Sequence, residues 1–267
     1  MSDLPNIIDV LLDPVSLTSF AIYLALIAWE AAFPARKLPP MPGWRVKGLI
    51  AFAAYFLVST YLPYVWSARL SAWQLLDLTV LGTWGGAAAG LLVYELGAYA
   101  YHRSMHRSPL LWRWLHQMHH SAERLDTWSA FWFSPLDMAG WTLVSSLTLT
   151  LVIGITPEAT VVVLLTLMTL AVFQHSNIRT PRWLGYIVQR PESHSLHHAR
   201  QIHNGNYADL PVFDMLFGTF HNPRDFMPAV GFYDGASRRL LDMLRGRDVG
   251  SDPHDLRAIG GLGYLRE

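Results

Sequence analysis

The 267-residue chain is 52% hydrophobic and only 15% charged, and its mean hydropathy is positive. Soluble domains average about 25% charged residues, so this composition excludes an ordinary soluble domain and indicates one membrane-embedded unit over residues 1–267. The 20 basic and 20 acidic side chains cancel, which argues against a nucleic-acid partner. Cysteine is absent, which excludes disulfides and thiolate-held metal clusters.

Five apolar segments follow along the chain, each close to the ~20 residues that cross a bilayer core. The last two are shorter, so they form either a full hairpin or a pair that enters the membrane part-way. We therefore expect an all-α bundle with four to five membrane spans. The segments are residues 17–33, 46–65, 78–101, 138–155 and 158–174.

The first connection is basic, with Arg36, Lys37, Arg45 and Lys47 in a short loop. Such an excess favours the cytoplasmic side of a membrane. Counting crossings from there returns the chain to the cytoplasm after the third and fifth segments, where histidines follow. We expect an integral multi-pass protein, in the inner membrane if the source is bacterial, with its histidines on a cytoplasmic helical cap.

The third segment carries two features besides its hydropathy. Gly82, Gly86 and Gly90 are spaced by four residues, which lets another helix approach closely. Glu95 lies two helical turns before His102, so it faces the same side. Glu95 is a metal ligand, a partner that orients a ligand imidazole, or an acid that extends to the membrane surface.

Nine of the twelve histidines fall into four tight groups. His102 and His106 are separated by four residues, so both rings share one helix face. Two H-x-x-H-H patterns also place their rings on one face each, and a repeated three-histidine pattern is hard to obtain by chance. The nine candidate metal ligands are His102, His106, His116, His119, His120, His175, His194, His197 and His198.

The residue types of these groups narrow the choice of metal. Imidazole suits zinc, copper, iron and nickel, and nine histidines exceed the needs of one ion, so two metals are expected. Hydrolytic two-metal sites generally include carboxylates, and none falls inside these patterns. Iron that handles dioxygen fits better, although zinc can take its place in a purified sample.

The segment Glu95–Ser121, with FQHSN at 173–177, HSLHH at 194–198 and NYADLPVFDMLFGTF at 206–220, resembles the fatty acid hydroxylase and sterol desaturase superfamily. The resemblance covers roughly residues 90–225 and implies an integral-membrane enzyme with a pair of iron ions. It implies that dioxygen and two electrons are used to hydroxylate or desaturate a C–H bond of a lipid, such as a fatty acyl chain, sterol or carotenoid. The nine histidines named above occupy the motif positions.

Several polar residues near the motifs have alternative interpretations. Related sequences often have an acid at the position of His203, which is therefore either an extra ligand or a polar loop residue. Asn177 belongs either to the metal ligands or to the groups that support them. His221 and His254 lie outside the motifs and are expected to be solvated. Residues 236–267 form a peripheral tail, in which 237–247 is typical of an amphipathic helix on lipid headgroups.

No flavin, haem or nucleotide motif occurs, so we expect electrons from a separate ferredoxin-like or cytochrome-like donor with its reductase. Alternative functions are a metal transporter, or a catalytically silent or non-redox membrane protein that binds metal or lipid. Aromatic residues near the motifs either line a substrate cavity or form an interface belt. They are Trp112, Trp114, Trp128, Phe131, Trp132, Phe133 and Trp141.

Overall fold

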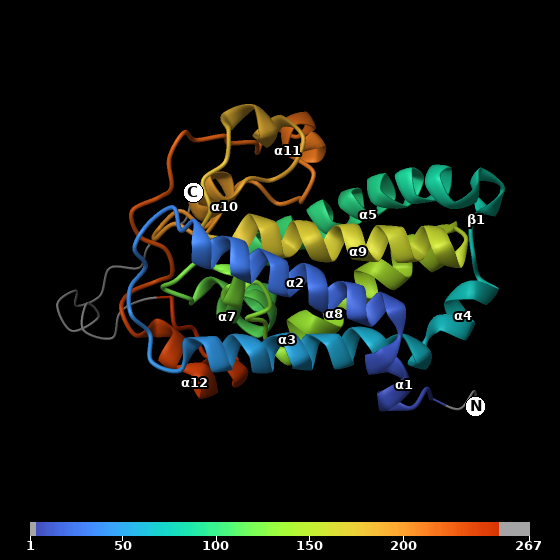
Figure 1. Ribbon diagram of the computed structural model, residues 1–267, viewed down its shortest axis with the longest axis horizontal. Coiled ribbons are helices and arrows are strands. Elements are labelled where there is room, and N and C mark those ends of the chain that lie inside the picture. Colours follow the sequence, from blue (N-terminus) through green and yellow to red (C-terminus); the bar gives the residue numbers. More distant parts are fainter. Residues whose placement is uncertain (1–3, 251–267) are drawn as a thin grey trace.

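The computed structural model describes residues 4–250, which are mostly helical as expected. Five long helical segments run side by side, and shorter helices lie at both ends of this bundle (Figure 1). The long segments are α2 (Pro14–Ala32), α3 (Trp44–Tyr61), α5 (Gly82–Arg107), α8 (Pro135–Ser146), which continues as the π-helical η5 (Leu147–Val152), and α9 (Pro157–His175).

The short elements lie at the two ends of the bundle. At the end opposite the histidines, α1 (Ile7–Leu12) and α4 (Ser67–Ala72) accompany the parallel pair β1 (Leu76–Asp77) and β2 (Ile153–Gly154), in which Leu76 pairs with Ile153. The histidine end forms a cap of short helices. Its elements are α6 (Pro109–Leu111), η3 (Trp112–His116), α7 (Gln117–His120), η6 (Arg182–Tyr186), α10 (Pro191–His197), α11 (Val212–Leu216) and α12 (Leu240–Leu244).

Three long helices begin with the same local signal, a capping side chain followed by proline. Asp13 accepts from the Val15 amide, Ser134 from the Asp137 amide and Thr156 from the Ala159 amide. Such a cap satisfies one free N–H, and proline at the first helical position loses no hydrogen bond. These signals fix where α2, α8 and α9 start.

Helices α5 and α9 pack closely through small residues. A Cβ atom on Gly86 would lie 3.1 Å from Ala159 Cβ, and one on Gly90 would lie 2.9 Å from Val163 Cγ2. The close approach predicted from the glycine spacing is confirmed at these two positions. Gly82 instead begins α5 with φ +62°, a left-handed conformation that favours glycine, and nothing lies within 4 Å of its Cβ position.

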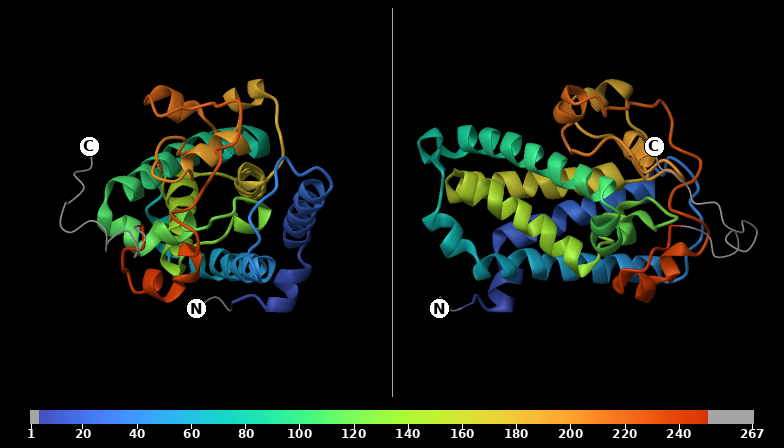
Figure 2. Two further views of the ribbon diagram at one scale, coloured as in Figure 1. Left: turned by 90° about the vertical axis from the view of Figure 1, so that its left-hand side faces the viewer. Right: turned by 180° about the vertical axis from the view of Figure 1, so that it is seen from behind.

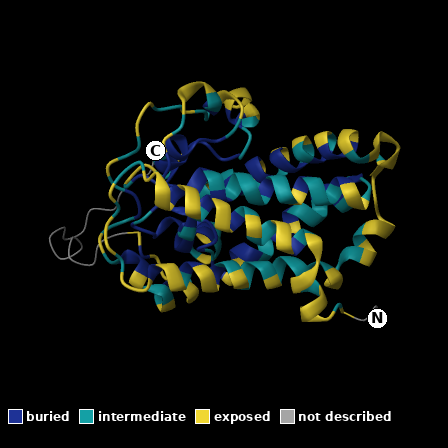
Figure 3. Cartoon of the chain, in the orientation of Figure 1, coloured by how far each residue is buried: buried dark blue, intermediate teal, exposed yellow. Residues whose placement is uncertain are grey.

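Three helical segments are long and apolar enough to cross a membrane, namely Pro14–Ala32, Trp44–Val65 and Pro157–His175. Large apolar side chains on these helices, such as Leu24 and Ile50, are exposed. Figure 3 shows exposed stretches along α2 and α3. Among residues 4–250 the third and fourth expected spans, 78–101 and 138–155, do not reach the same hydropathy and length. Helix α5 contains Glu95 and Arg103, and α8 ends after 12 residues. Seen from behind, α8 crosses between α5 and α3 (Figure 2).

The tail packs on the cap through part of its length. In the segment expected to form an amphipathic helix, only Leu240–Leu244 is α-helical, after the short 3-10 helix η7 (Ala236–Arg238). Met243 is buried in a cluster with Trp44 and Met118, whereas Leu241 is exposed. His254 and the rest of the tail from residue 251 lie outside the described residues.

Candidate metal centre

All nine predicted ligand histidines fall into two groups at the cap end of the bundle. Within each group, one ring nitrogen of every histidine lies within 4.8 Å of the others. The five-histidine group contains His102, His106, His116, His120 and His197. The four-histidine group contains His119, His175, His194 and His198.

Each H-x-x-H-H pattern is divided between the two groups, which differs from the expectation that each serves one face. The first pattern gives His116 and His120 to the five-histidine group and His119 to the other. The second gives His194 and His198 to the four-histidine group and His197 to the five-histidine group. The two groups therefore adjoin, and the His120 and His198 rings stack with centroids 4.1 Å apart.

Hydrogen bonds fix the ring orientation in the five-histidine group. Nδ1 of His102 donates to the Tyr207 carbonyl at 2.8 Å, and Nδ1 of His197 donates to the Gly205 carbonyl at 2.7 Å. His106 Nδ1 likewise donates to the His203 carbonyl. Because a carbonyl only accepts, these neutral rings carry their proton on Nδ1 and leave Nε2 as a bare lone pair.

The bare nitrogens converge without a protein donor. Nε2 of His102 lies 2.9 Å from Nε2 of His116, and Nε2 of His106, His120 and His197 has no hydrogen-bond partner among the described residues. Buried lone pairs that face one another are unfavourable unless a cation lies among them. The five-histidine group therefore fits a metal ion.

The four-histidine group converges through its Nε2 atoms. His175 Nε2 lies 3.1 Å from His119 Nε2 and 3.0 Å from His194 Nε2, and the His194 and His198 Nε2 atoms are 3.1 Å apart. His175 Nδ1 donates to the Ala171 carbonyl within α9, so its Nε2 is also a bare lone pair. Four imidazole ligands match the usual coordination number of a tetrahedral ion.

Burial also prepares the cap histidines for a metal. Loss of solvent, followed by repulsion from neighbouring imidazoles, lowers the pKa of His116, His120 and His198 well below the usual value. These rings are therefore neutral at pH 7, the form that binds metals.

Asp137 is a site residue that the sequence analysis missed. Its Oδ2 atom lies 2.9 Å from His116 Nδ1, and the carboxylate is fully buried at the start of α8. A carboxylate behind a ligand imidazole fixes the ring and raises its basicity. The available signal was an acid at the edge of an apolar segment, a costly placement unless the acid is paired.

The three open candidates occupy different places around the groups. His203 Nδ1 lies 3.0 Å from His120 Nδ1, and burial lowers the pKa of His203 to about 4. Asn177 bonds the backbone of Arg36 instead of a histidine, and Glu95 accepts from the Leu210 amide. Neither metal group includes any of the three.

A loop of irregular backbone presents the carbonyls that orient His102 and His197. Asp214 accepts hydrogen bonds from the amides of Tyr207 and Ala208 and from the Thr219 hydroxyl. Gly205, with φ +75°, makes the turn that precedes these residues. His221 is exposed at the edge of this loop, in agreement with its expected peripheral place.

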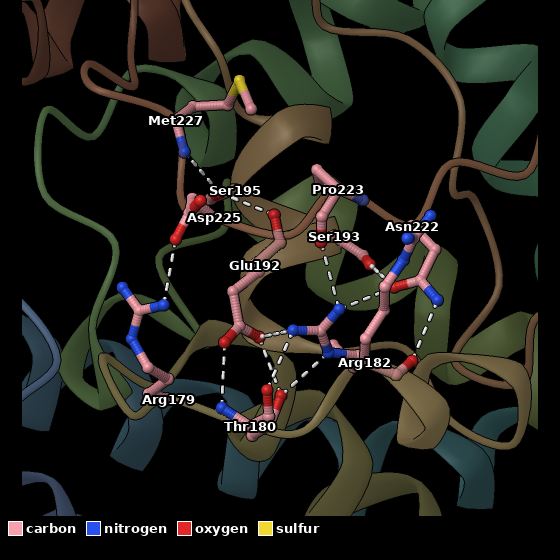
Figure 4. A network of polar contacts seen from close by, with 11 residues as sticks. Arg179, Thr180, Arg182, Glu192, Ser193, Ser195, Asn222, Pro223, Asp225 and Met227 are labelled. Atoms are coloured by element: carbon pink, nitrogen blue, oxygen red, sulfur yellow. Dashed lines mark hydrogen bonds and ion pairs between the residues drawn. The ribbon is translucent and has the colours of Figure 1, made fainter.

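Helix α10, which carries His194 and His197 and ends immediately before His198, is held by a buried ion pair. Arg190 Nη2 lies 3.0 Å from Glu192 Oε2, and both side chains are at most 1% exposed. Thr180 donates its amide and hydroxyl to Glu192, and Asn222 accepts from Arg190. The labelled partners Thr180, Glu192 and Asn222 converge in Figure 4. This network satisfies the buried charges and anchors the start of α10.

A cavity of about 480 Å³ leads from the histidines between the long helices. Its histidine end is formed by His102, His116, His119, His175 and His194. Phe131, Phe133 and Trp141 line its wall, so these three of the candidate aromatics face the cavity. Trp112 instead packs against His106 and His120, with ring centroids 5.1 Å apart in both pairs.

Comparison with known proteins places this site in a family. The family model described as fatty acid hydroxylase matches residues 87–219, which include eight motif histidines up to His198 and His175 between them. Ornithine lipid hydroxylase OlsE of Rhizobium tropici is 32% identical over 139 residues, covering 50% of this chain and 41% of that relative. The match thus spans less than half of the relative's length. No solved structure is significantly similar. Through the segment that carries its histidine motifs, the chain belongs to the fatty acid hydroxylase family.

Proposed function

We propose that this chain is an integral-membrane oxygenase that holds two iron ions and hydroxylates a C–H bond of a lipid. The observation that carries the proposal is the position of two converging imidazole groups at one end of a largely apolar cavity. Two bound irons would supply the activation of dioxygen that attack on an unactivated C–H bond requires. An external electron donor would provide two electrons per turnover.

The chain's own residues perform the supporting tasks. The Tyr207 and Gly205 carbonyls and Asp137 hold the ligand rings, so metal coordination needs little rearrangement. Phe131, Phe133 and Trp141 enclose the reacting end of a substrate and exclude water. The hydroxylase name of the relative favours an alcohol product over a double bond.

We further propose that the whole chain is one domain with α2, α3 and α9 as spans and α5 with α8 completing a bundle of four to five. The basic loop after α2 would then place the histidine cap in the cytoplasm. The cytoplasm is the compartment in which a reduced electron donor is available.

The test is metal analysis of purified protein, followed by incubation with reductant, electron donor and lipid extract under labelled dioxygen. We expect two irons per chain and label in a lipid alcohol. Tightly bound zinc with no label incorporated would instead favour a non-redox metal-binding or lipid-binding protein. Zinc moved across vesicles would indicate a transporter.

A further inference from the structure

Hydroxyl groups line the end of the cavity that lies farthest from the histidines. Five of them, which we call the hydroxyl belt, come from three helices: Ser16, Ser19, Ser59, Thr60 and Thr160. Ser16 and Ser19 lie near the start of α2, Ser59 and Thr60 at the end of α3, and Thr160 near the start of α9. Between the belt and the histidines the wall is largely apolar, with Phe52, Phe131, Leu167 and Met168, and the hydroxyls of Ser145, Ser146 and Thr150 line the side formed by α8 and η5.

The belt and the histidines are separated by the length of a lipid chain. Thr160 and His175 both line the cavity on α9, and 15 residues of helix correspond to ~22 Å at a rise of ~1.5 Å per residue. The hydrocarbon of one bilayer leaflet is ~15 Å thick, half of a ~30 Å core. The separation is longer than one leaflet's hydrocarbon, so only a long chain in a fully extended conformation reaches from the histidines to the belt.

Three of the five belt hydroxyls have already donated their proton and can only accept a hydrogen bond from a ligand. Ser19 donates its hydroxyl to the Val15 carbonyl at 2.9 Å, Ser59 to the Phe56 carbonyl at 3.1 Å, and Thr160 to the Thr156 carbonyl at 3.1 Å. Their protons are thereby used within their own helices, and their remaining lone pairs are available to a ligand. A ligand group that binds these three hydroxyls must therefore donate, whereas Ser16 and Thr60, which make no side-chain hydrogen bond among residues 4–250, can donate or accept.

The charge of the lining also restricts the ligand. Of the residues from 4 to 250, no Lys or Arg lines the cavity. A phosphate or carboxylate at the belt would be desolvated without a countercharge, which is costly. The group that fits is therefore uncharged.

We propose that the hydroxyl belt binds a neutral hydrogen-bond donor, a hydroxyl or an amide N–H, at the far end of a long-chain lipid whose other end lies at the histidines. This inference rests on the proposed oxygenase function, because it names the substrate class of the same site. It also sets the position of oxidation, since the carbon at the histidines is remote from the polar group at the belt.

The experiment measures binding, so that it does not depend on turnover. Purified full-length protein in detergent, loaded with iron, is mixed with a fluorescent long-chain alcohol. Hexadecanol, hexadecanamide, hexadecyl methyl ether and hexadecanoate are then compared as competitors, because they share one chain and differ at the end group. We expect the alcohol or the amide to bind about tenfold tighter than the ether, and the carboxylate to bind weakest. The better of the first two identifies the donor.

A paired variant tests the belt itself. Ser19→Ala with Ser59→Ala removes two acceptors without a large change in volume. The alcohol or amide should then bind about as tightly as the ether, while the affinity for the ether stays the same. Ser71→Ala, on the exposed helix α4, is the matched control and should keep the full preference. Equal binding of alcohol, amide and ether to the unmodified protein, or an unchanged preference in the paired variant, would overturn the proposal.

The two proposals fail in different ways. A preference for the alcohol or amide without incorporation of labelled oxygen would support the belt proposal and contradict the oxygenase assignment. Hydroxylation of lipid without this preference would contradict the belt proposal alone.

Discussion

The two histidine groups use the same ligand type but are supported very differently. In the five-histidine group every ring has a partner at Nδ1, supplied by Tyr207, Gly205, Asp137 or His203. In the four-histidine group only His175 has a well-formed one, the Ala171 carbonyl. Among residues 4–250 the Nδ1 atoms of His194 and His198 have no partner, and His119 has only the nearby Trp132 carbonyl.

This difference indicates a division of roles. Outer partners fix ring orientation and strengthen metal binding, so the five-histidine group is expected to hold a bound ion more rigidly. The four-histidine group has no spare ligand and contributes His119, His175 and His194 to the cavity wall. We therefore expect its rings to change orientation more readily beside a substrate, and we expect it to lose a bound ion more easily.

The largest effect is expected from loss of a ligand. His119→Ala and His197→Ala should each abolish turnover while leaving membrane insertion unchanged. His119→Ala leaves three imidazoles in its group and should lose one iron per chain, whereas His197→Ala leaves four and should retain more iron. Metal content and label incorporation are the measurements. Full activity in either variant would refute the ligand assignment.

The next largest effect concerns an element that serves both groups. Arg190→Met leaves the buried Glu192 carboxylate unpaired, and breaking such a pair costs about 3–5 kcal/mol. The midpoint temperature of thermal unfolding should fall. Iron should be lost from both groups, because α10 contributes histidines to each. Arg179→Ala, which breaks an exposed ion pair with Asp225, is the control and should cost under about 1 kcal/mol. Equal destabilisation by the two variants would contradict this account of α10.

A smaller effect is expected where one group has support that the other lacks. Asp137→Ala removes the partner of His116 and should lower metal affinity or activity roughly 10- to 100-fold. The loss should fall on the five-histidine group, which can be followed by iron content in the His119→Ala background. Asp225→Ala on the surface should have no such effect. Unchanged iron binding in Asp137→Ala would show that the carboxylate does not support the site.

The smallest effect separates a supporting histidine from a peripheral one. His203→Phe keeps the backbone carbonyl that orients His106 but removes the ring nitrogen that contacts His120, so we expect a loss of only a few fold, ~1 kcal/mol for one hydrogen bond. His221→Ala, in an exposed position, should leave turnover unchanged. A loss as large as that of His197→Ala would make His203 a ligand.

The sequence was sufficient to predict the helical class and to select the nine histidines, because hydropathy and residue spacing are local properties. It did not predict how His119 and His197 separate from the other members of their patterns, since that depends on how α7 and α10 face each other across the cap. The supporting carbonyls of Tyr207 and Gly205 were equally inaccessible, because any residue offers a carbonyl and only the fold of the loop aims it. Asp137 lies outside the motifs and meets His116 only through the packing of α8 against η3.

The central claim is that two adjoining groups each hold one iron, and the iron-to-chain ratio tests it most directly. Protein purified without oxygen and with iron supplied should contain two irons per chain, and His119→Ala should contain one. A ratio of one in the unmodified protein, or an unchanged ratio in His119→Ala, would contradict the assignment of two separate metal sites.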